Sequence, residues 1–198
     1  MTTRVNVGRE SHTTDVRFVA LTQQTRDDNQ VVVSVFDPLA TITTKEQNLR
    51  DGQVFYVFFA RLTGNLLPDG GTVDVVVTPN PGTNVCLSAR VQCGGNAEFF
   101  VHENVTDIVG GTIFVPINRN RRSTNISQVG VLINPTVTLN GVIYEEIVLG
   151  GSGGNASGGV VDGIDYIVKP DVSTLFRLKN VSGQARLAEL QLTWCEPT

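Results

Sequence analysis

Few side chains in this sequence combine a type and a spacing that could support catalysis. The two histidines, His12 and His102, are far apart in the chain and match neither a catalytic triad nor a metal-binding spacing. His102 precedes Glu103 near the end of an apolar segment, so we expect it to be a hydrogen-bonded structural residue. Glu145 and Glu146 are consecutive, and consecutive residues of a strand point to opposite faces, so they cannot act as an acid–base pair in one site.

Two further segments could bind an ion or a phosphate group. A calcium ion at Asp27 and Asp28 would need more oxygen ligands than the neighbouring residues supply. The glycine-rich segment Gly150–Gly159 lacks the Gly-Lys-Ser/Thr ending and the following helix of a phosphate-binding loop, so we interpret it as a connection between strands. No pattern indicates the two convergent carboxylates that a glycosidase requires. We therefore predict that the protein is not an enzyme and has no catalytic residue, metal or cofactor.

The cysteines do not form a recognisable framework. Cys86, Cys93 and Cys195 are odd in number and lack the paired spacings of a disulfide scaffold or a zinc site. Cys93 is in phase with the alternating apolar residues that begin at Val85, which predicts a small core residue.

The segment Asn118–Asn125 is the one strongly basic, amide-rich stretch. Arg119, Arg121 and Arg122 repel one another unless solvent or acidic groups screen their charges. Two interpretations stay open: a solvated loop, or a contact with a partner protein in which Asn118 and Asn120 supply further hydrogen bonds. Most of the 15 basic residues are arginine, which is enriched in protein interfaces; genomic base composition would produce the same bias.

Composition limits the remaining function classes. The net charge of −4 argues against general nucleic-acid binding, which favours a basic surface. No apolar run reaches the length of a membrane span, and the first residues contain no signal-peptide core. We therefore expect synthesis in a cytoplasm, with no nucleic-acid or membrane partner.

The elements that would position these residues are strands. Period-two alternation between glycine- and proline-rich turns predicts many short strands, and in the last two of them Phe176, Leu178 and Trp194 fall on apolar faces. Asn140-Gly141 between 136–139 and 142–148 is the strongest hairpin signal. The prediction is an all-β antiparallel sandwich, a jelly roll, over residues 41–198, preceded by an extended N-terminal arm over residues 1–40.

The predicted strand 53–60 is apolar on both faces. It is either a central strand covered on both sides or a strand with one face buried against another subunit.

A set of motifs in a fixed order resembles a family of small structural proteins of tailed bacteriophages, the capsid decoration or cement proteins. The motifs are Asn118–Asn125, the Thr-Val-Thr strand at 136–138, Gly150–Gly154, Tyr166–Pro170, Leu175–Gly183 and Trp194. The resemblance covers about Ile42 to Trp194. The family usually ends in Trp-Tyr-Glu, where this chain has Trp194-Cys195-Glu196, and residues 1–40 match nothing in the family.

The resemblance implies a jelly-roll-like protein on the exterior of the capsid, bound to the major capsid protein and stabilising the phage head. Asn118, Arg119, Asn120, Arg121 and Arg122 are the candidate interface residues. We also expect a homo-oligomer, with a trimer preferred over a dimer. The alternative is an accessory sandwich of a phage tail or tail fibre that binds a host receptor or glycan. Such binders are expected to have aromatic residues in exposed loops, and the long loops here contain none.

Overall fold

The computed structural model describes residues 44–150 and 160–196. The chain divides into two units, 1–47 and 48–198, and the helix α1 (Thr44–Arg50) crosses the boundary between them. The predicted arm 1–40 and most of the predicted loop Gly150–Gly159 lie outside the described residues. All strands described below belong to the second unit.

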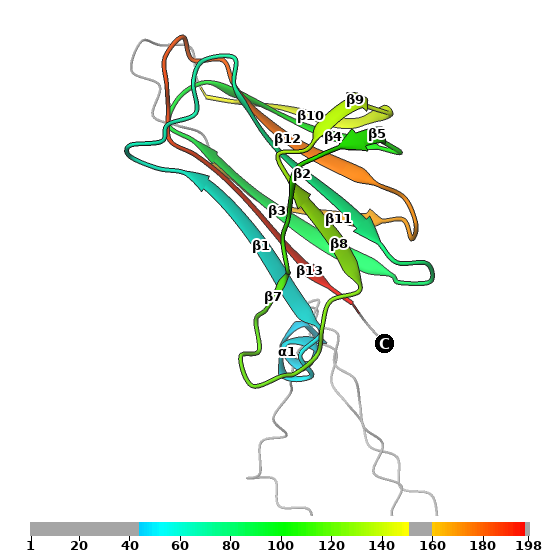
Figure 1. Cartoon of the computed structure of the whole chain (residues 1–198). Helices are drawn as coiled ribbons and strands as arrows, with labels where there is room; N and C mark the ends of the chain where they lie inside the picture. Colours follow the sequence, from blue (N-terminus) through cyan, green and yellow to red (C-terminus); the bar gives the residue numbers. More distant parts are fainter. Residues whose placement is uncertain (1–43, 151–159, 197–198) are drawn as a thin grey trace, which may run out of the picture. The chain divides into compact units, whose positions relative to one another are not determined.

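The second unit is an antiparallel β-sandwich, as the sequence predicts (Figure 1). The first sheet has the spatial order β11 (Val160–Val168), β3 (Val85–Cys93), β13 (Ala188–Cys195), β1 (Val54–Arg61) and β7 (Ile117–Asn118). The second has the order β10 (Val142–Leu149), β4 (Ala97–Glu103), β12 (Thr174–Asn180), β2 (Thr72–Pro79), β8 (Val129–Ile133) and β6 (Thr112–Ile113). A small third sheet pairs β5 (Thr106–Val109) with β9 (Thr136–Leu139).

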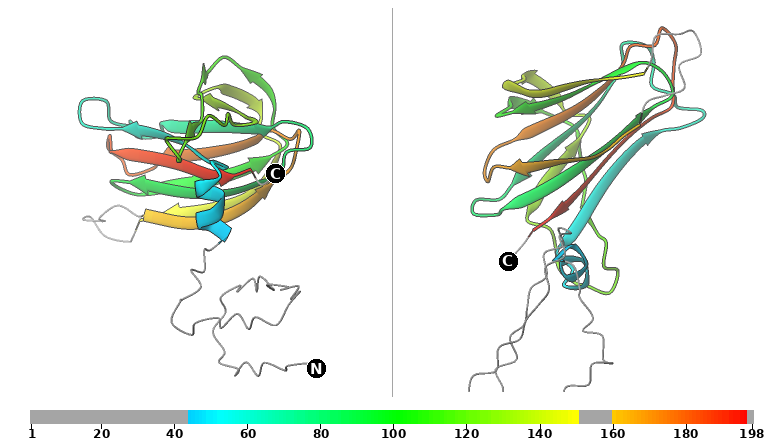
Figure 2. Two further views of the ribbon diagram at one scale, coloured as in Figure 1. Left: turned by 90° about the horizontal axis from the view of Figure 1, so that it is seen from below. Right: turned by 180° about the vertical axis from the view of Figure 1, so that it is seen from behind.

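The connections carry the chain back and forth between the two large sheets. Strands β1 to β4 alternate between the first and second sheets, and so do β10 to β13 (Figure 2). Each sheet therefore has one face turned toward the other, and both inner faces must be apolar. The jelly-roll topology stays a prediction.

The core lies between the inner faces of the two large sheets. Trp194 is 1% exposed and stacks on Phe55, with ring centroids 6.4 Å apart, so the predicted apolar face of the last strand lies in the core. Phe176 and Leu178 are buried on the inner face of β12, and Arg177 lies on its outer face. Cys93 is also fully buried, which confirms its predicted core position.

The third sheet covers part of the outer face of the six-stranded sheet. Val76 and Leu175 point to that outer face and are buried in a second apolar cluster with Val105. Ile108 of β5 and Val137 of β9 pack against this cluster. The apolar residues on the outer side of β2 and β12 are thereby removed from water.

The predicted hairpin at Asn140-Gly141 is wrong. Strand β9 pairs with β5, and β10 pairs with β4, so the two strands that flank this turn do not pair with each other. The dipeptide instead carries the chain from the small sheet to the edge of the six-stranded sheet. Gly141 has a φ of 65°, and a Cβ there would lie 2.2 Å from the carbonyl oxygen of Glu103, so the close approach of the two backbones requires glycine.

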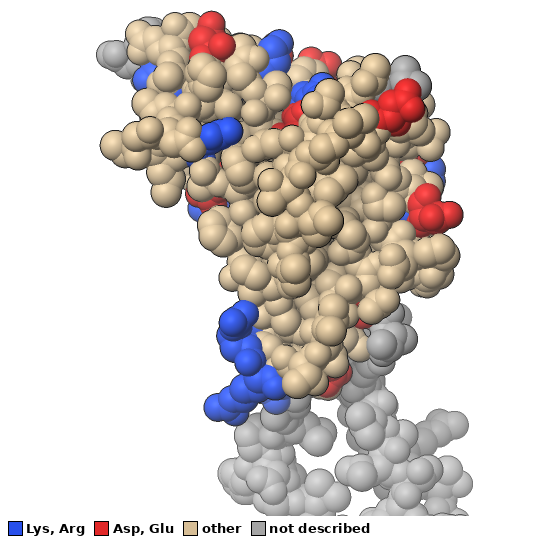
Figure 3. Space-filling model, in the orientation of Figure 1, with Lys and Arg blue, Asp and Glu red and all other residues tan. Residues whose placement is uncertain are grey.

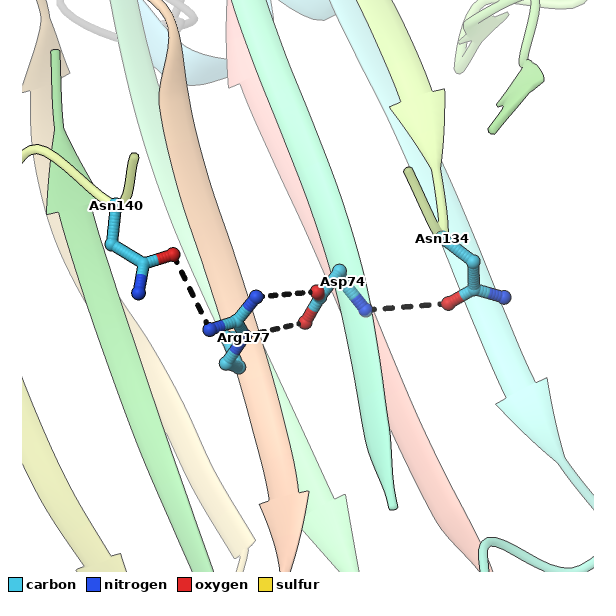
Figure 4. A network of polar contacts seen from close by, with 4 residues as sticks. All are labelled: Asp74, Asn134, Asn140 and Arg177. Carbon is cyan, nitrogen blue, oxygen red and sulfur yellow. Dashed lines mark hydrogen bonds and ion pairs between the residues drawn. The ribbon is translucent and has the colours of Figure 1, made fainter. Parts of the chain in front are cut away.

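A charged pair on the outer face of the six-stranded sheet joins its two central strands, β12 and β2 (Figure 4). The Arg177 guanidinium of β12 donates two hydrogen bonds to the Asp74 carboxylate of β2, Nε to Oδ1 at 2.8 Å and Nη2 to Oδ2 at 2.7 Å. Asn134 accepts a hydrogen bond from the backbone N–H of Asp74, and Asn140 accepts one from Arg177. The Asp74 side chain is only 8% exposed, so neither charge of the pair can be left alone without a desolvation cost.

We therefore expect Asp74→Ala to destabilise the protein by about 3 kcal/mol, because it leaves the Arg177 charge buried and unpaired. The matched control is Glu98→Ala, which breaks the more exposed pair with Lys179 and should cost at most about 1 kcal/mol. Urea unfolding followed by Trp194 fluorescence measures both. Equal losses in the two variants would contradict the role given to the Asp74–Arg177 pair.

His102 is buried beside this pair, and the expectation of a hydrogen-bonded structural histidine is not met at its Nδ1. It lies on the outer face of β4, 6% exposed, and its Nδ1 has no hydrogen-bond partner. Burial, reinforced by the positive charge of Arg177, lowers the pKa of His102 from 6.5, while Asp74 acts in the opposite direction. The neutral imidazole is therefore the form that the fold accommodates.

The sign of the resulting pH dependence follows from this shift. The unfolded chain takes up a proton at His102 near pH 6.5, and the folded protein does so only at lower pH, so stability decreases as the pH falls below 6.5. His102→Gln should reduce the loss of unfolding free energy between about pH 7.5 and pH 5.5. Urea titrations of both proteins at the two pH values measure it. An identical loss in wild type and variant would contradict the prediction.

Candidate functional site

In residues 44–150 and 160–196, no cluster of three or more His, Cys, Asp or Glu side chains could hold a metal ion. Within the same residues, no helix has the length and apolar character needed to cross a bilayer. A hydrogen bond of 2.6 Å from the Tyr166 hydroxyl of β11 to the Glu145 carboxylate of β10 joins the two large sheets. Burial and this hydrogen bond raise the pKa of Tyr166, which keeps the phenol protonated.

Tyr166 also lines a small cavity near the edge formed by β10 and β11. The cavity, of about 20 Å³, is bounded by Val101, Tyr144, Tyr166 and Phe176 among others. A volume of this size is enough for about one water molecule. Glu145 is inward-facing and Glu146 is exposed, as expected for consecutive strand residues, so they do not form a pair in one site.

The predicted interface residues lie together in the loop that follows β7. Strand β7 pairs with β1, with Asn118 opposite Phe55. The loop therefore starts from the edge strand of the five-stranded sheet. The Asn118 side chain donates to the carbonyl oxygen of Gly52 at 2.8 Å and to that of Asn125 at 3.3 Å. Its Oδ1 accepts a hydrogen bond of 2.8 Å from the backbone N–H of Asn120. Asn118 therefore joins both ends of the loop to the turn before β1.

Two other asparagines repeat this arrangement. Asn120 donates to the carbonyl oxygen of Arg50 at 2.7 Å and accepts from the backbone N–H of Arg122 at 3.1 Å. Asn125 donates to the carbonyl oxygen of Asp51 at 3.0 Å. These side chains satisfy backbone groups that a loop outside the sheets would otherwise leave to water. The loop has a defined conformation that does not depend on the arginine side chains.

Gly52 is the point where the loop approaches the turn most closely. A Cβ at this residue would lie 2.1 Å from the Ser123 hydroxyl oxygen, and its φ is 69°. Any larger residue would push the loop away from the turn and strain the backbone.

The residues between the loop and β8 are held by Glu196, which sequence reasoning missed. Its carboxylate is buried and accepts hydrogen bonds from the Trp194 indole Nε1 at 2.7 Å, the Gln128 backbone N–H at 2.8 Å and the Ser127 hydroxyl. The Glu196 backbone N–H donates to the carbonyl oxygen of Gln53 at 2.9 Å. The signal that could have found it is the acidic residue two positions after the only tryptophan.

The structure separates the three arginines that the sequence treats alike. The Arg119 guanidinium lies over the Tyr56 ring, 5.4 Å from its centroid, and donates to the Thr193 hydroxyl at 3.2 Å, so this side chain rests on the outer face of the five-stranded sheet. Arg121 and Arg122 are exposed, and within the described part of the chain neither guanidinium contacts a carboxylate. Among the described residues, the site therefore presents two cations without acidic partners on a hydrogen-bonded loop.

Figure 3 shows the charge distribution on one face of the protein, in the orientation of Figure 1. Lys and Arg gather at the lower end of this view, where the loop after β7 lies, and much of the remaining surface of this face is uncharged. A cluster of one sign attracts a surface of the opposite sign over several ångströms.

The outer face of β1 is apolar and open. Phe58 is 49% exposed and stacks with Tyr56, with ring centroids 6.4 Å apart. The inner residues Phe55 and Val57 are buried in the core. The interpretation of this strand as covered on both sides is therefore wrong for the described unit, whereas burial of its second face against another subunit stays a prediction.

Compared with known proteins, the chain matches no protein-family model, and no match was found among curated proteins or solved structures. The resemblance to phage decoration proteins therefore stays a hypothesis, and the site is interpreted from its geometry alone.

The loop geometry predicts a difference between its amides and its cations. Asn118→Ala removes three hydrogen bonds in a partly buried position and should destabilise the protein by about 1–2 kcal/mol. Arg121→Ala should change the free energy of unfolding by no more than about 0.5 kcal/mol, because the side chain is exposed and unpaired. Urea unfolding and amide hydrogen exchange of residues 118–125 measure both effects. Faster exchange in Arg121→Ala than in Asn118→Ala would contradict this division of roles.

Proposed function

We propose that this chain is a non-enzymatic structural protein of a tailed-bacteriophage virion, a capsid decoration or cement protein that binds the major capsid protein and stabilises the head. The observation that supports it is the loop Asn118–Asn125, held by a network of amide hydrogen bonds, in which Arg121 and Arg122 are exposed and have no acidic partner among the described residues. A preorganised loop of this kind loses little conformational entropy on binding, so its charges are available for a partner surface.

The chemistry of the loop indicates the chemistry of the partner. Guanidinium groups form charge-assisted, bidentate bonds with carboxylates, so an acidic patch on the capsid exterior is the surface that fits. Attachment at many equivalent positions on a shell adds weak contacts into a collective effect, so a modest affinity for each site is sufficient for stabilisation.

Self-association is part of the same proposal, with a trimer preferred over a dimer. The open apolar face of β1, with Tyr56 and Phe58, is a surface that a second subunit would cover. The trimer is implied by the resemblance and by the three-fold positions of capsids, and not by the geometry of this face.

The alternative function is an accessory protein of a phage tail or tail fibre that binds a host receptor or glycan. The specific observation in its favour is the same pair, Tyr56 and Phe58, because exposed aromatic rings are used to bind sugars and proteins. These rings lie on a sheet face, so the absence of aromatic residues from the long loops does not count against this function as strongly as the sequence suggested.

The cement function predicts that the protein co-sediments with purified DNA-filled particles, and that the double variant Arg121→Ala/Arg122→Ala does so poorly. Each truncated pair that is buried in the interface should cost about 2–5 kcal/mol, so we expect an affinity at least tenfold lower on particles stripped of the native protein. Light scattering of the free variant verifies that its oligomeric state is unchanged. The control is Lys179→Ala, which removes a partly exposed cation from the outer face of the six-stranded sheet and leaves the loop unaltered.

Two results would contradict the proposal. Absence of the wild-type protein from particle heads, with labelling on tails, would favour the accessory function. Full occupancy of the double variant would show that the loop is a solvated turn, whatever the location of the protein.

A further inference from the structure

Two of the three cysteines lie side by side on the outer face of the five-stranded sheet. Cys195 of β13 is directly opposite Cys86 of β3 in the antiparallel register. Their neighbours Trp194 and Leu87 are buried in the core, so both thiols point to the other face of the sheet. Cys86 is exposed and Cys195 is partly exposed, whereas Cys93 is fully buried.

The register brings these two residues into the range of a disulfide bond. Directly opposed residues of an antiparallel pair have Cα atoms about 4.5–5.5 Å apart, and disulfides span Cα separations of about 4.4–6.8 Å. Their Cβ atoms are about 4.5–5.5 Å apart, and a disulfide brings them to about 3.5–4.5 Å. Cys195 is the last residue of β13, so the closure of about 1 Å moves the end of a strand and not its interior.

The two thiols differ in their surroundings, which assigns them different roles. Burial and the neighbouring Cys86 raise the pKa of the Cys195 thiol, and a hydrogen bond with the Asn48 side chain acts in the opposite direction. Cys86 is the more accessible of the two and is flanked on β11 by Ile167, which is 85% exposed. An oxidant in solution therefore reaches Cys86 first, and Cys195 is placed to resolve the product.

We propose that Cys86 and Cys195 form a reversible intrachain disulfide that joins the last strand to β3 when the protein meets an oxidising thiol–disulfide mixture. The proposal rests on the register of β3 and β13 and on the exposure of both thiols. It is independent of the basic loop and of the proposed function.

The reaction needs a low-molecular-weight disulfide as the oxidant. The thiolate of Cys86 attacks one sulfur of this disulfide, which forms a mixed disulfide and releases one small thiolate. Cys195 then loses its proton, and its thiolate attacks the Cys86 sulfur and releases the second small thiolate. Two protein thiols are thereby oxidised to one disulfide, the oxidant is reduced to two small thiols, and these take up the two protons.

The bond would stabilise the strand on which the core and the basic loop both depend. Strand β13 lies between β3 and β1, and its last residue, Cys195, is followed directly by Glu196. A cross-link between residues 86 and 195 closes a long loop in the unfolded chain, which lowers the conformational entropy of the unfolded state. The oxidised protein should therefore unfold at a temperature about 4–10 °C higher than the reduced protein.

The test uses the full chain, with excess glutathione disulfide as the probe. We expect the free thiols, counted under denaturing conditions, to fall from three to one, and the mass to fall by two hydrogen atoms. Peptide mapping should join the peptides that contain Cys86 and Cys195 and leave Cys93 as a thiol. Three remaining thiols, a stable glutathione adduct at Cys86, or a disulfide between two chains would each overturn the proposal.

Single variants provide the matched controls. Cys93→Ser should form the same disulfide and show the same thermal shift on oxidation. Cys195→Ser, with its fold verified by circular dichroism, should stop at the mixed disulfide of Cys86 and show no rise in the unfolding temperature. An equal rise in Cys195→Ser and wild type would show that the stabilisation does not come from this bond.

Discussion

The buried indole N–H of Trp194 links the packing of the core to the chain segment next to the basic loop. A tryptophan that closes the core must find an acceptor for its N–H, because an unpaired polar group in the interior costs about 1–3 kcal/mol. Glu196 supplies that acceptor, and the remaining capacity of its carboxylate binds Ser127 and Gln128. Glu196 therefore accepts the hydrogen bond of the buried indole and also binds the residues that follow the basic loop. Core packing and the position of the loop are thereby coupled through one carboxylate.

The outer faces of the two large sheets differ in how far other parts of the described chain cover them. On the six-stranded sheet, β5 and β9 cover Val76 and Leu175, and the polar groups near this cover must be paired, as Asp74 is with Arg177. On the five-stranded sheet, Phe58 on the outer face of β1 is exposed, and among the described residues Arg119 lies over the neighbouring ring of Tyr56. Within the described unit, the six-stranded sheet is covered over part of β2 and β12, whereas the outer face of β1 is uncovered next to the basic loop, which makes this face a candidate contact surface.

Alternating apolar residues were sufficient to predict the sandwich and much of its core. The positions of Phe176, Leu178, Cys93 and Trp194 follow from period two alone, because an inner face must be apolar whatever its partner strand is. The hairpin at Asn140-Gly141 failed for the converse reason. A turn signal indicates that the chain reverses or bends, but the partner of β9 was decided by the apolar cluster that Ile108 and Val137 share with distant strands.

For the candidate site, the sequence by itself determined the composition of the loop: three cations among amide side chains that favour turns. Tertiary structure decided what each of them does. Contact with Tyr56 and Thr193 distinguishes Arg119 from the two exposed arginines. Hydrogen bonds to the carbonyl groups of residues 50–52 determine which asparagine side chains hold the loop in place. The register of β3 and β13 likewise places Cys86 opposite Cys195, although the two residues are 109 positions apart in the sequence. Alternation of apolar and polar residues along a strand is a local property, so the sequence shows it directly. Which strands pair with each other depends on burying all the apolar faces of the protein together, and no local pattern contains that information.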